Sequence, residues 1–188
     1  MKSIIRCKWC LSSERMIKYH DEEWGVPIHN DRVLFEYILL DAFQAGLSWS
    51  TILNKRENFE RAFDKFDYRE IAKYGDDKII ELINDAGIIR NKAKINSTVT
   101  NAKAFIEIQK EFGTFDKYIW QFTKGKTINN LQDDLRPIPT RSAESDEMSK
   151  DLIKRGFKFV GSTICYAFMQ AAGMLNDHHV NCFRHKTV

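Results

Sequence analysis

The pattern of hydrophobic and polar residues is helical along most of the chain. Apolar residues recur at intervals of three and four, and only three prolines occur. Asp31 is predicted to cap one helix, with Leu34, Phe35, Ile38, Leu39 and Ala42 on its buried face. Ser48 is predicted to cap a second, with Ile52, Leu53 and Phe59. A third begins at Asp76 or Asp77, with Ile79, Ile80, Leu82 and Ile83. A longer helix begins near Asn91, with Ile95, Val99, Ala102, Phe105, Ile106 and Ile108.

The second half of the chain continues this pattern after one interruption. Residues 114–122 are short and aromatic, and residues 123–145 contain two of the three prolines, which predicts an irregular connection. Two further helices are expected at about 145–155 and 162–172, each followed by a glycine. There is no internal repeat, and the predicted class is all-α.

Composition narrows the class of protein. The chain has 188 residues, 43% of them hydrophobic, enough for a single domain with its own core. Residues 1–8 contain no signal-peptide-like apolar stretch, and polar residues and glycines interrupt the apolar run 159–175. We therefore expect a soluble, cytoplasmic protein that does not enter a membrane. Because 29 Lys and Arg nearly balance 26 Asp and Glu, any DNA contact must come from local patches.

Four residues near the two ends of the chain form a candidate metal site: Cys7, His20, His178 and Cys182. Two cysteines and two histidines suit tetrahedral Zn²⁺, and a helical turn would align His178 with Cys182. Two other interpretations stay open at this point. In the first, the cysteines are small buried hydrophobic residues and the histidines are surface groups whose hydrogen bonds are made elsewhere. In the second, Cys7 forms a C-x-x-C pair with Cys10, which suggests a redox pair or another ligand set.

Residues 85–90, Asp-Ala-Gly-Ile-Ile-Arg, lie between two predicted helices. Gly87 and the basic residues Arg90, Lys92 and Lys94 would present backbone N–H groups and positive charge to a DNA phosphate, as in a helix-hairpin-helix. An ordinary turn between two helices explains the same residues, so the motif alone does not decide between them.

Polar-tipped aromatic residues are concentrated in the first quarter of the chain. Trp9, Tyr19, Trp24 and Trp49 occur there together with Asp41, which lies one position from the apolar stripe of its helix. Aromatic faces can stack a nucleobase, and a carboxylate can accept a hydrogen bond from an exocyclic amine. These residues are candidates for a base pocket, although solvent-exposed Asp41 and tryptophans of an ordinary core are the alternative.

Five separated runs together resemble the constitutive bacterial DNA-3-methyladenine glycosylase I family: residues 19–27, 44–49, 85–90, 154–161 and 176–178. The resemblance implies an all-α fold of the helix-hairpin-helix glycosylase superfamily, with the hairpin at residues 85–90. It also implies one structural Zn²⁺ held by Cys7, His20, His178 and Cys182, which joins the two termini and leaves Cys10 without a role.

The same resemblance places the base pocket and the DNA contacts. Tyr19 and Trp49 would contact the flipped base, with Trp9 and Trp24 as walls, and Asp41 would read the base where the family has a glutamate. Gly46 and Leu47, with Gln44 nearby, would approach the gap left in the duplex. Gly87, Arg90 and Lys92 would contact the DNA backbone.

The implied activity is hydrolysis of the N-glycosidic bond of 3-methyladenine in double-stranded alkylated DNA, with the free base as product. We expect a monomer of one glycosylase domain, residues 1–188, with a helical lobe at 31–140 and a zinc-bound lobe formed by 1–30 and 141–188. The alternative from a different class is a non-catalytic, zinc-stapled helical module that binds DNA or senses damage.

Overall fold

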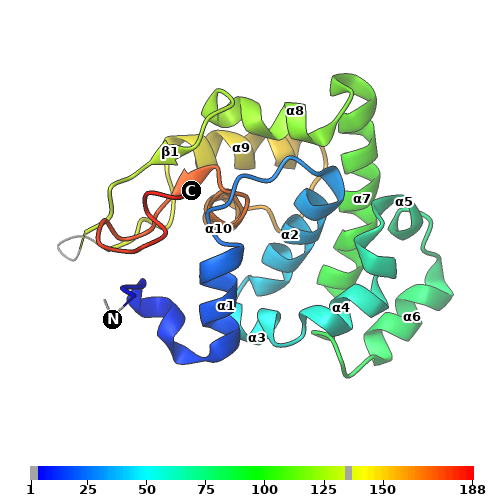
Figure 1. The fold of residues 1–188 in the computed structure, drawn as a ribbon. Helices are drawn as coiled ribbons and strands as arrows, with labels where there is room; N and C mark the ends of the chain where they lie inside the picture. Colours follow the sequence, from blue (N-terminus) through cyan, green and yellow to red (C-terminus); the bar gives the residue numbers. More distant parts are fainter. Residues whose placement is uncertain (1–3, 134–136) are drawn as a thin grey trace.

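The computed structural model describes residues 4–133 and 137–188, most of them in helices (Figure 1). The α-helices are α1 Glu14–Glu22, α2 Asp31–Gln44, α3 Trp49–Leu53, α4 Arg56–Ala62, α5 Tyr68–Ile71, α6 Asp76–Asn84, α7 Lys92–Phe112, α8 Phe115–Ile119, α9 Ala143–Lys154 and α10 Ser162–Ala171. Short 3₁₀ segments are η1 Lys8–Ser12, η2 Asp64–Phe66 and η3 Trp120–Thr123. Residues 134–136, part of the predicted irregular connection, and residues 1–3 at the N-terminus lie outside the described part.

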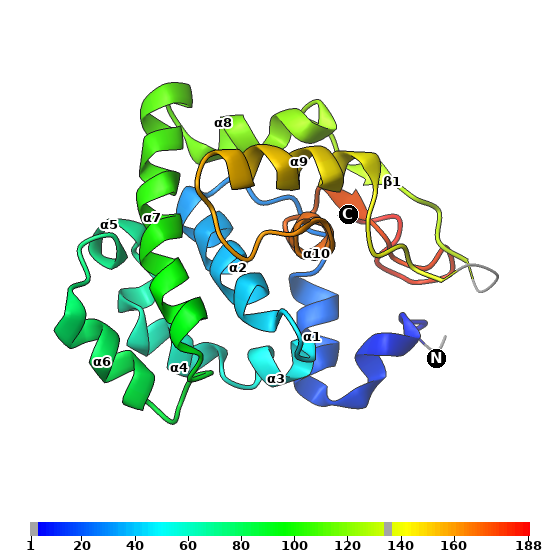
Figure 2. The ribbon, with the colours of Figure 1, turned by 180° about the vertical axis from the view of Figure 1, so that it is seen from behind.

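Helix α2 occupies the centre of the fold, with α7 on one side and α10 on another (Figures 1 and 2). Its predicted apolar face is buried throughout, which confirms the helical period read from the sequence. The predicted cap was wrong by one residue. Asn30 caps the helix by accepting from the backbone N–H groups of Arg32 and Val33, whereas the Asp31 carboxylate accepts from the N–H groups of Phe115 and Asp116 and thereby binds the start of α8.

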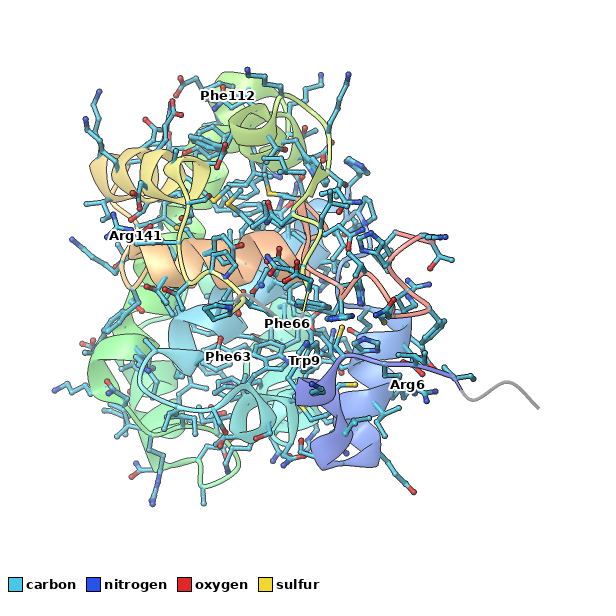
Figure 3. The ribbon with its side chains drawn as sticks, turned by 90° about the vertical axis from the view of Figure 1, so that its left-hand side faces the viewer. Arg6, Trp9, Phe63, Phe66, Phe112 and Arg141 are labelled. Carbon is cyan, nitrogen blue, oxygen red and sulfur yellow. The ribbon has the colours of Figure 1, made fainter. Side chains whose placement is uncertain are left out.

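Aromatic side chains fill the interior beside α2. Phe35 lies edge-on to Phe105 of α7 at 5.2 Å between ring centroids, and Phe105 stacks on Phe115 at 4.0 Å. Phe63 and Phe66, labelled in Figure 3, are also buried. This core fixes α2 and α7 relative to each other.

Three predicted helices differ in detail. Ser48 caps α3 as expected, but the segment divides into α3 and α4, and Phe59 lies on α4. On α6 only Leu82 is fully buried; Ile80, predicted to be apolar core, is 57% exposed because α6 lies at the edge of the fold against α7. Helix α9 begins two residues early, since Ser142 and Ser145 form a reciprocal capping box.

The fold is not purely α-helical. The connection after η3 contains β1, Ile128–Asn129, which pairs in parallel with β2, Leu175–Asn176. Two-residue strands have no alternation to detect in sequence, so the pattern could not reveal them. This pairing places the C-terminal tail next to the connection that follows η3. A parallel β-bridge between Gln132 and His179 continues the pairing.

Gly173 brings the end of α10 against the chain before α2. Its φ is +71°, and an added Cβ would lie 2.3 Å from the backbone of Val26 and Pro27. The backbone N–H of Ile28 donates to the Ala172 carbonyl at 3.1 Å. This close approach holds residues 24–28 in place.

In the described part of the chain, the helices are too short or too polar to cross a bilayer.

Candidate functional site

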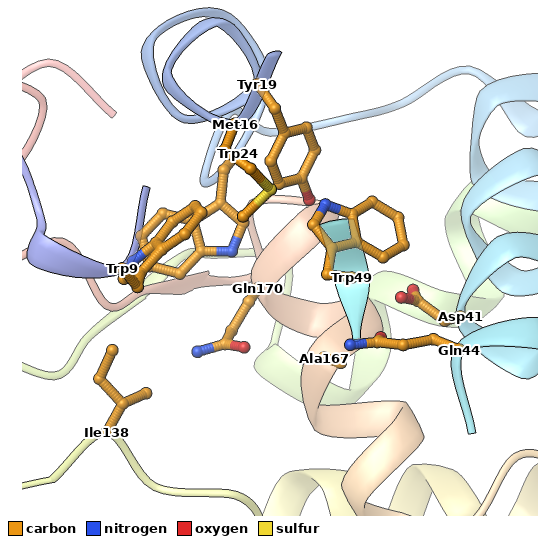
Figure 4. Close-up of a pocket in the computed structure, with 10 residues that line it drawn as sticks. All are labelled: Trp9, Met16, Tyr19, Trp24, Asp41, Gln44, Trp49, Ile138, Ala167 and Gln170. Carbon is orange, nitrogen blue, oxygen red and sulfur yellow. The ribbon is translucent and has the colours of Figure 1, made fainter. Parts of the chain in front are cut away.

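A cavity of about 190 Å³ opens between α1, α2, α3 and α10 (Figure 4). It is lined by Trp9, Met16, Tyr19, Trp24, Asp41, Gln44, Trp49, Ile138, Ala167 and Gln170. All of the predicted base-pocket residues lie among these, although they come from separate elements. Helix packing, rather than proximity in sequence, assembles the cavity.

Asp41 is the most unusual group in this cavity. Its side chain is buried on α2, and its Oδ2 atom has no hydrogen-bond partner among the described residues. Burial raises the pKa of the Asp41 carboxyl well above its usual range, since no nearby cation offsets the loss of hydration. A buried carboxyl without a partner costs stability, so its position is explained best by a ligand that supplies hydrogen bonds.

Four aromatic rings form the walls of the cavity. Tyr19 and Trp49 lie 5.2 Å apart between ring centroids, and Trp9 meets Trp24 edge-on at 4.8 Å. The indole Nε1 atoms of Trp9 and Trp49 are buried without a partner in the described chain. Burial raises the pKa of Tyr19 well above its usual value, so its hydroxyl remains protonated and can donate. The cavity therefore offers flat apolar faces together with unpaired polar atoms.

The predicted metal ligands meet behind this pocket. One ligand atom from each of Cys7, His20, His178 and Cys182 lies within 4.8 Å of the others, and all four side chains are buried. The predicted helical turn is wrong, because His178 and Cys182 lie in a non-helical segment closed by a bond from the Cys182 N–H to the His179 carbonyl. A metal ion can be held at this cluster.

Both histidines are oriented by their second ring nitrogen. His20 Nδ1 lies 2.7 Å from Asp21, which Arg6 holds, while His178 Nε2 lies 3.0 Å from the Trp24 carbonyl. The opposite nitrogens, Nε2 of His20 and Nδ1 of His178, consequently face the cysteine sulfurs. Such outer partners fix the ring orientation in metal-binding histidines.

Burial keeps two of the candidate ligands neutral, and no cysteine is held in a disulfide. Burial raises the pKa of the Cys7 thiol to about 12 and lowers that of His178 to about 4, so neither group is readily charged without a metal. All four cysteines of the chain are free. Cys10 lies outside the cluster and donates to the Cys7 carbonyl, which argues against the alternative ligand set.

The cluster of candidate metal ligands contacts the pocket directly. Trp24 lies edge-on to His178 at 4.6 Å between ring centroids, and Trp9 lies edge-on to His20 at 5.4 Å between ring centroids. Two walls of the cavity therefore rest on the candidate ligands.

Comparison with known proteins agrees with this geometry. A family model described as methyladenine glycosylase matches residues 9–185. The chain belongs to the methyladenine glycosylase family. It is 45% identical to DNA-3-methyladenine glycosylase 1 of Escherichia coli over 94% of this chain and 95% of that protein. The resemblance inferred from five sequence runs is thus confirmed.

Solved structures of this family share the fold. A crystal structure of 3-methyladenine DNA glycosylase I matches with a TM-score of 0.92 and 44% identity, covering 95% of this chain and 98% of that one. A variant of 3-methyladenine DNA glycosylase I in complex with 3-methyladenine matches with a TM-score of 0.91 and 30% identity, over 95% of this chain and 96% of that one.

Several lining residues of this glycosylase were missed in the sequence. Met16 lies three residues before Tyr19, a spacing that shares one helix face, so α1 periodicity could have identified it. Ala167 and Gln170 lie on α10, and Ile138 lies beyond η3, far from the aromatic cluster in sequence. No sequence signal brought those three to the pocket.

The rim of the pocket is formed by the turn after α2. Gln44 lines the cavity, Gly46 has a φ of +78°, and Leu47 is 41% exposed. The turn is held from below by Lys94, which donates to the Phe43 and Ala45 carbonyls at 2.8 and 2.6 Å. Lys94 was expected among the exposed basic residues of the hairpin; it is buried instead, because it caps the end of α2.

The turn between α6 and α7 coincides with the predicted hairpin. The Gly87 N–H donates to Asp85 Oδ1 at 2.7 Å, and the Gly87 carbonyl accepts from Lys55 and Asn58. Gly87 does not have the left-handed φ often required of turn glycines; an added Cβ would instead lie 2.9 Å from Asp85 Oδ1. Arg90 and Lys92 are exposed beside this turn.

Proposed function

We propose that this chain is a DNA-3-methyladenine glycosylase that acts in base-excision repair. It flips the damaged nucleotide out of double-stranded alkylated DNA and hydrolyses its N-glycosidic bond, releasing free 3-methyladenine. The observation that carries this proposal is the buried Asp41 carboxyl in an aromatic cavity, whose Oδ2 atom has no hydrogen-bond partner among the residues that the structure describes. The relatives' name and the solved complex with 3-methyladenine support the same substrate.

The chemistry of the substrate fits this cavity. Methylation at N3 leaves adenine in the nucleotide positively charged, so the glycosidic bond is already weakened and the base departs as a neutral molecule. Aromatic faces such as those of Tyr19 and Trp49 attract a cationic base, and Asp41 can accept from its amine. Aspartate is one methylene shorter than the glutamate of the family, so the base must sit closer to α2 or be bridged by water.

We propose that the metal is a single structural Zn²⁺. In a tetrahedral zinc site, bonds of about 2.3 Å to sulfur and 2.0 Å to nitrogen separate those ligand atoms by about 3.6 Å. The sulfur of Cys182 lies 3.4 Å from His20 Nε2, and both cysteine sulfurs lie 3.7 Å from His178 Nδ1. Four protein ligands leave no open position, so the ion would join the two ends of the chain without entering the reaction.

The proposed DNA contacts surround the pocket opening. Leu47 and Gly46 on the rim would approach the space vacated by the flipped nucleotide, with Gln44 between rim and pocket. The turn at residues 85–90 would act as a helix-hairpin-helix, with Arg90 and Lys92 near the DNA backbone. We retain the two lobes, residues 31–140 and residues 1–30 with 141–188, as a proposal.

Release of free 3-methyladenine from methylated duplex DNA tests the proposed function. Purified protein is incubated with duplex DNA treated with a methylating agent, and the released bases are separated and quantified. We expect 3-methyladenine in the soluble fraction and none without protein beyond spontaneous loss. DNA binding without release would instead support the non-catalytic, damage-sensing alternative.

Gly87→Asp is expected to weaken binding to duplex DNA about five- to tenfold at low salt. The new carboxylate would lie beside Asp85 and repel a phosphate held at this turn. With one phosphate contact fewer, the slope of log affinity against log salt concentration should become less steep by about one. Binding of free 3-methyladenine should be unchanged, because the cavity lies elsewhere. The measurement is a DNA titration at several salt concentrations.

Gly75→Asp is the matched control for this change. Gly75 precedes α6, has open space around it, and receives the same charge at a site where aspartate caps helices well. If Gly87→Asp and Gly75→Asp bind DNA equally well, the hairpin assignment is wrong.

A further inference from the structure

Asp177 is a buried acid that the proposed reaction does not use. Its carboxylate accepts four hydrogen bonds from residues that the structure describes: from Asn130 at 2.7 Å, Gln132 at 3.3 Å, the Tyr166 hydroxyl at 2.8 Å and the Gln170 amide at 2.7 Å. Only 1% of the residue is exposed. Of these four partners, only Gln170 also lines the base cavity.

The bond to Asp177 decides which way the Gln170 amide points. A carboxylate oxygen accepts and cannot donate, so the NH₂ group of Gln170 must face Asp177. The carbonyl oxygen Oε1 is then left on the other side of the amide, and Figure 4 shows it toward the cavity. The main chain is fixed as well, because the Gln170 carbonyl accepts from the Gly25 N–H at 3.1 Å.

Gln44 provides the contrast. It also lines the cavity, but its amide makes no hydrogen bond to a described residue, so either end can turn toward a ligand. Gln170 is therefore the glutamine with a fixed acceptor, and Asp41 on α2 supplies a second acceptor in the cavity.

We infer that Gln170 is a second base-reading residue and that Asp177 positions it; this rests on the proposed function. The exocyclic amine of 3-methyladenine has two N–H groups pointing in different directions, and a single carboxylate cannot satisfy both in a buried site. Asp41 accepts from one of them and Gln170 Oε1 from the other. The pair selects a purine with an amine at C6 over one with a carbonyl there, whose oxygen would face two acceptors.

The test compares free-base binding by two ligands of nearly equal shape, 3-methyladenine and 3-methylhypoxanthine, which has an oxygen in place of the amine. Calorimetry of the zinc-loaded full chain should show that the wild type prefers the amine by at least about tenfold. Gln170→Leu should lose about tenfold in affinity for 3-methyladenine and little for 3-methylhypoxanthine. The matched control is Gln121→Leu at an exposed position of η3, which should keep the wild-type preference.

Asp177→Asn separates positioning from simple structural support. The amide oxygen of the new asparagine would stay toward Asn130 and Gln132, and its NH₂ group would face Gln170, whose amide would turn over and present a donor to the cavity. The preference should then shift toward 3-methylhypoxanthine, a change that general loosening would not produce. Metal content and melting temperature report separately whether the variant is folded.

Two results would overturn the inference: an unchanged preference in Gln170→Leu, or an equal loss of affinity for both bases in Asp177→Asn with normal metal content. Failure of the proposed function looks different. In that case the wild type releases no 3-methyladenine from methylated DNA, while the free-base preference still decides the role of Gln170.

Discussion

Asp41→Asn is expected to slow single-turnover release of 3-methyladenine by about ten- to hundredfold. Hydrogen bonds that involve a charged group contribute about 1.5 to 3 kcal/mol, and about 1.4 kcal/mol corresponds to tenfold. Asparagine keeps the size of the side chain but replaces one acceptor with a donor that faces the amine of the base. Because Asp41 Oδ2 has no partner in the described protein, no internal hydrogen bond of that atom is lost in the variant.

Asp41→Glu and Asp77→Asn complete this experiment. Glutamate restores the residue of the family and the longer reach, so activity should be kept or improved. Asp77→Asn makes the same chemical change at an exposed position on α6 and should leave release unaffected. Equal single-turnover rates for wild type and Asp41→Asn would remove the carboxylate from the pocket assignment.

Asp41→Asn should also change how activity and stability depend on pH. Since burial raises the pKa of Asp41, the folded protein binds more protons than the unfolded chain between the ordinary and the raised pKa. Stability therefore falls as pH rises through that range, while excision rises as the carboxylate ionises. Asp41→Asn should flatten both dependences, so the variant loses activity but gains melting temperature relative to wild type toward neutral pH.

His178→Ala is expected to remove the metal and to loosen the C-terminal tail without unfolding the rest of the chain. The full binding energy of the metal sets an upper bound of about 8 to 16 °C on the fall in melting temperature. A ligand present at about 1,000 times its dissociation constant stabilises the fold by about 4 kcal/mol, and each kcal/mol shifts melting by about 2 to 4 °C in a chain of this size. Wild-type protein should contain about one zinc per chain by elemental analysis. A wild type without zinc would refute the metal assignment.

The loss of stability should be local. The cluster joins the tail to α1, whereas the aromatic core around α2 and α7 does not depend on it. Hydrogen exchange should therefore accelerate in residues 177–188 of His178→Ala, while amides of α2 remain protected. His29→Ala is the matched control, since His29 is an exposed histidine outside the cluster. Uniform loss of protection would show that the metal supports the entire fold.

The sequence by itself determined the mostly helical class and the family, and it supplied the candidate residues of the site. The apolar stripe of α2 predicted its buried face, because a side chain on a long helix recurs every 3.6 residues whatever packs against it. Residue type made Cys7, His20, His178 and Cys182 a candidate ligand set, and the family resemblance favoured this set over a pair of Cys7 with Cys10. Such properties are local or chemical, so they can be read along the chain.

Only the tertiary structure decided which side chains meet. Lys94 looked like an exposed basic residue of the hairpin. It instead donates to the carbonyl of Ala45 at the end of α2, 49 residues away in the sequence. Gln170 reaches the pocket because α10 packs on α2, and Asp177 orients it because β2 pairs with β1. Contacts of this kind depend on packing between elements distant in sequence, and no short-range period along the chain encodes them.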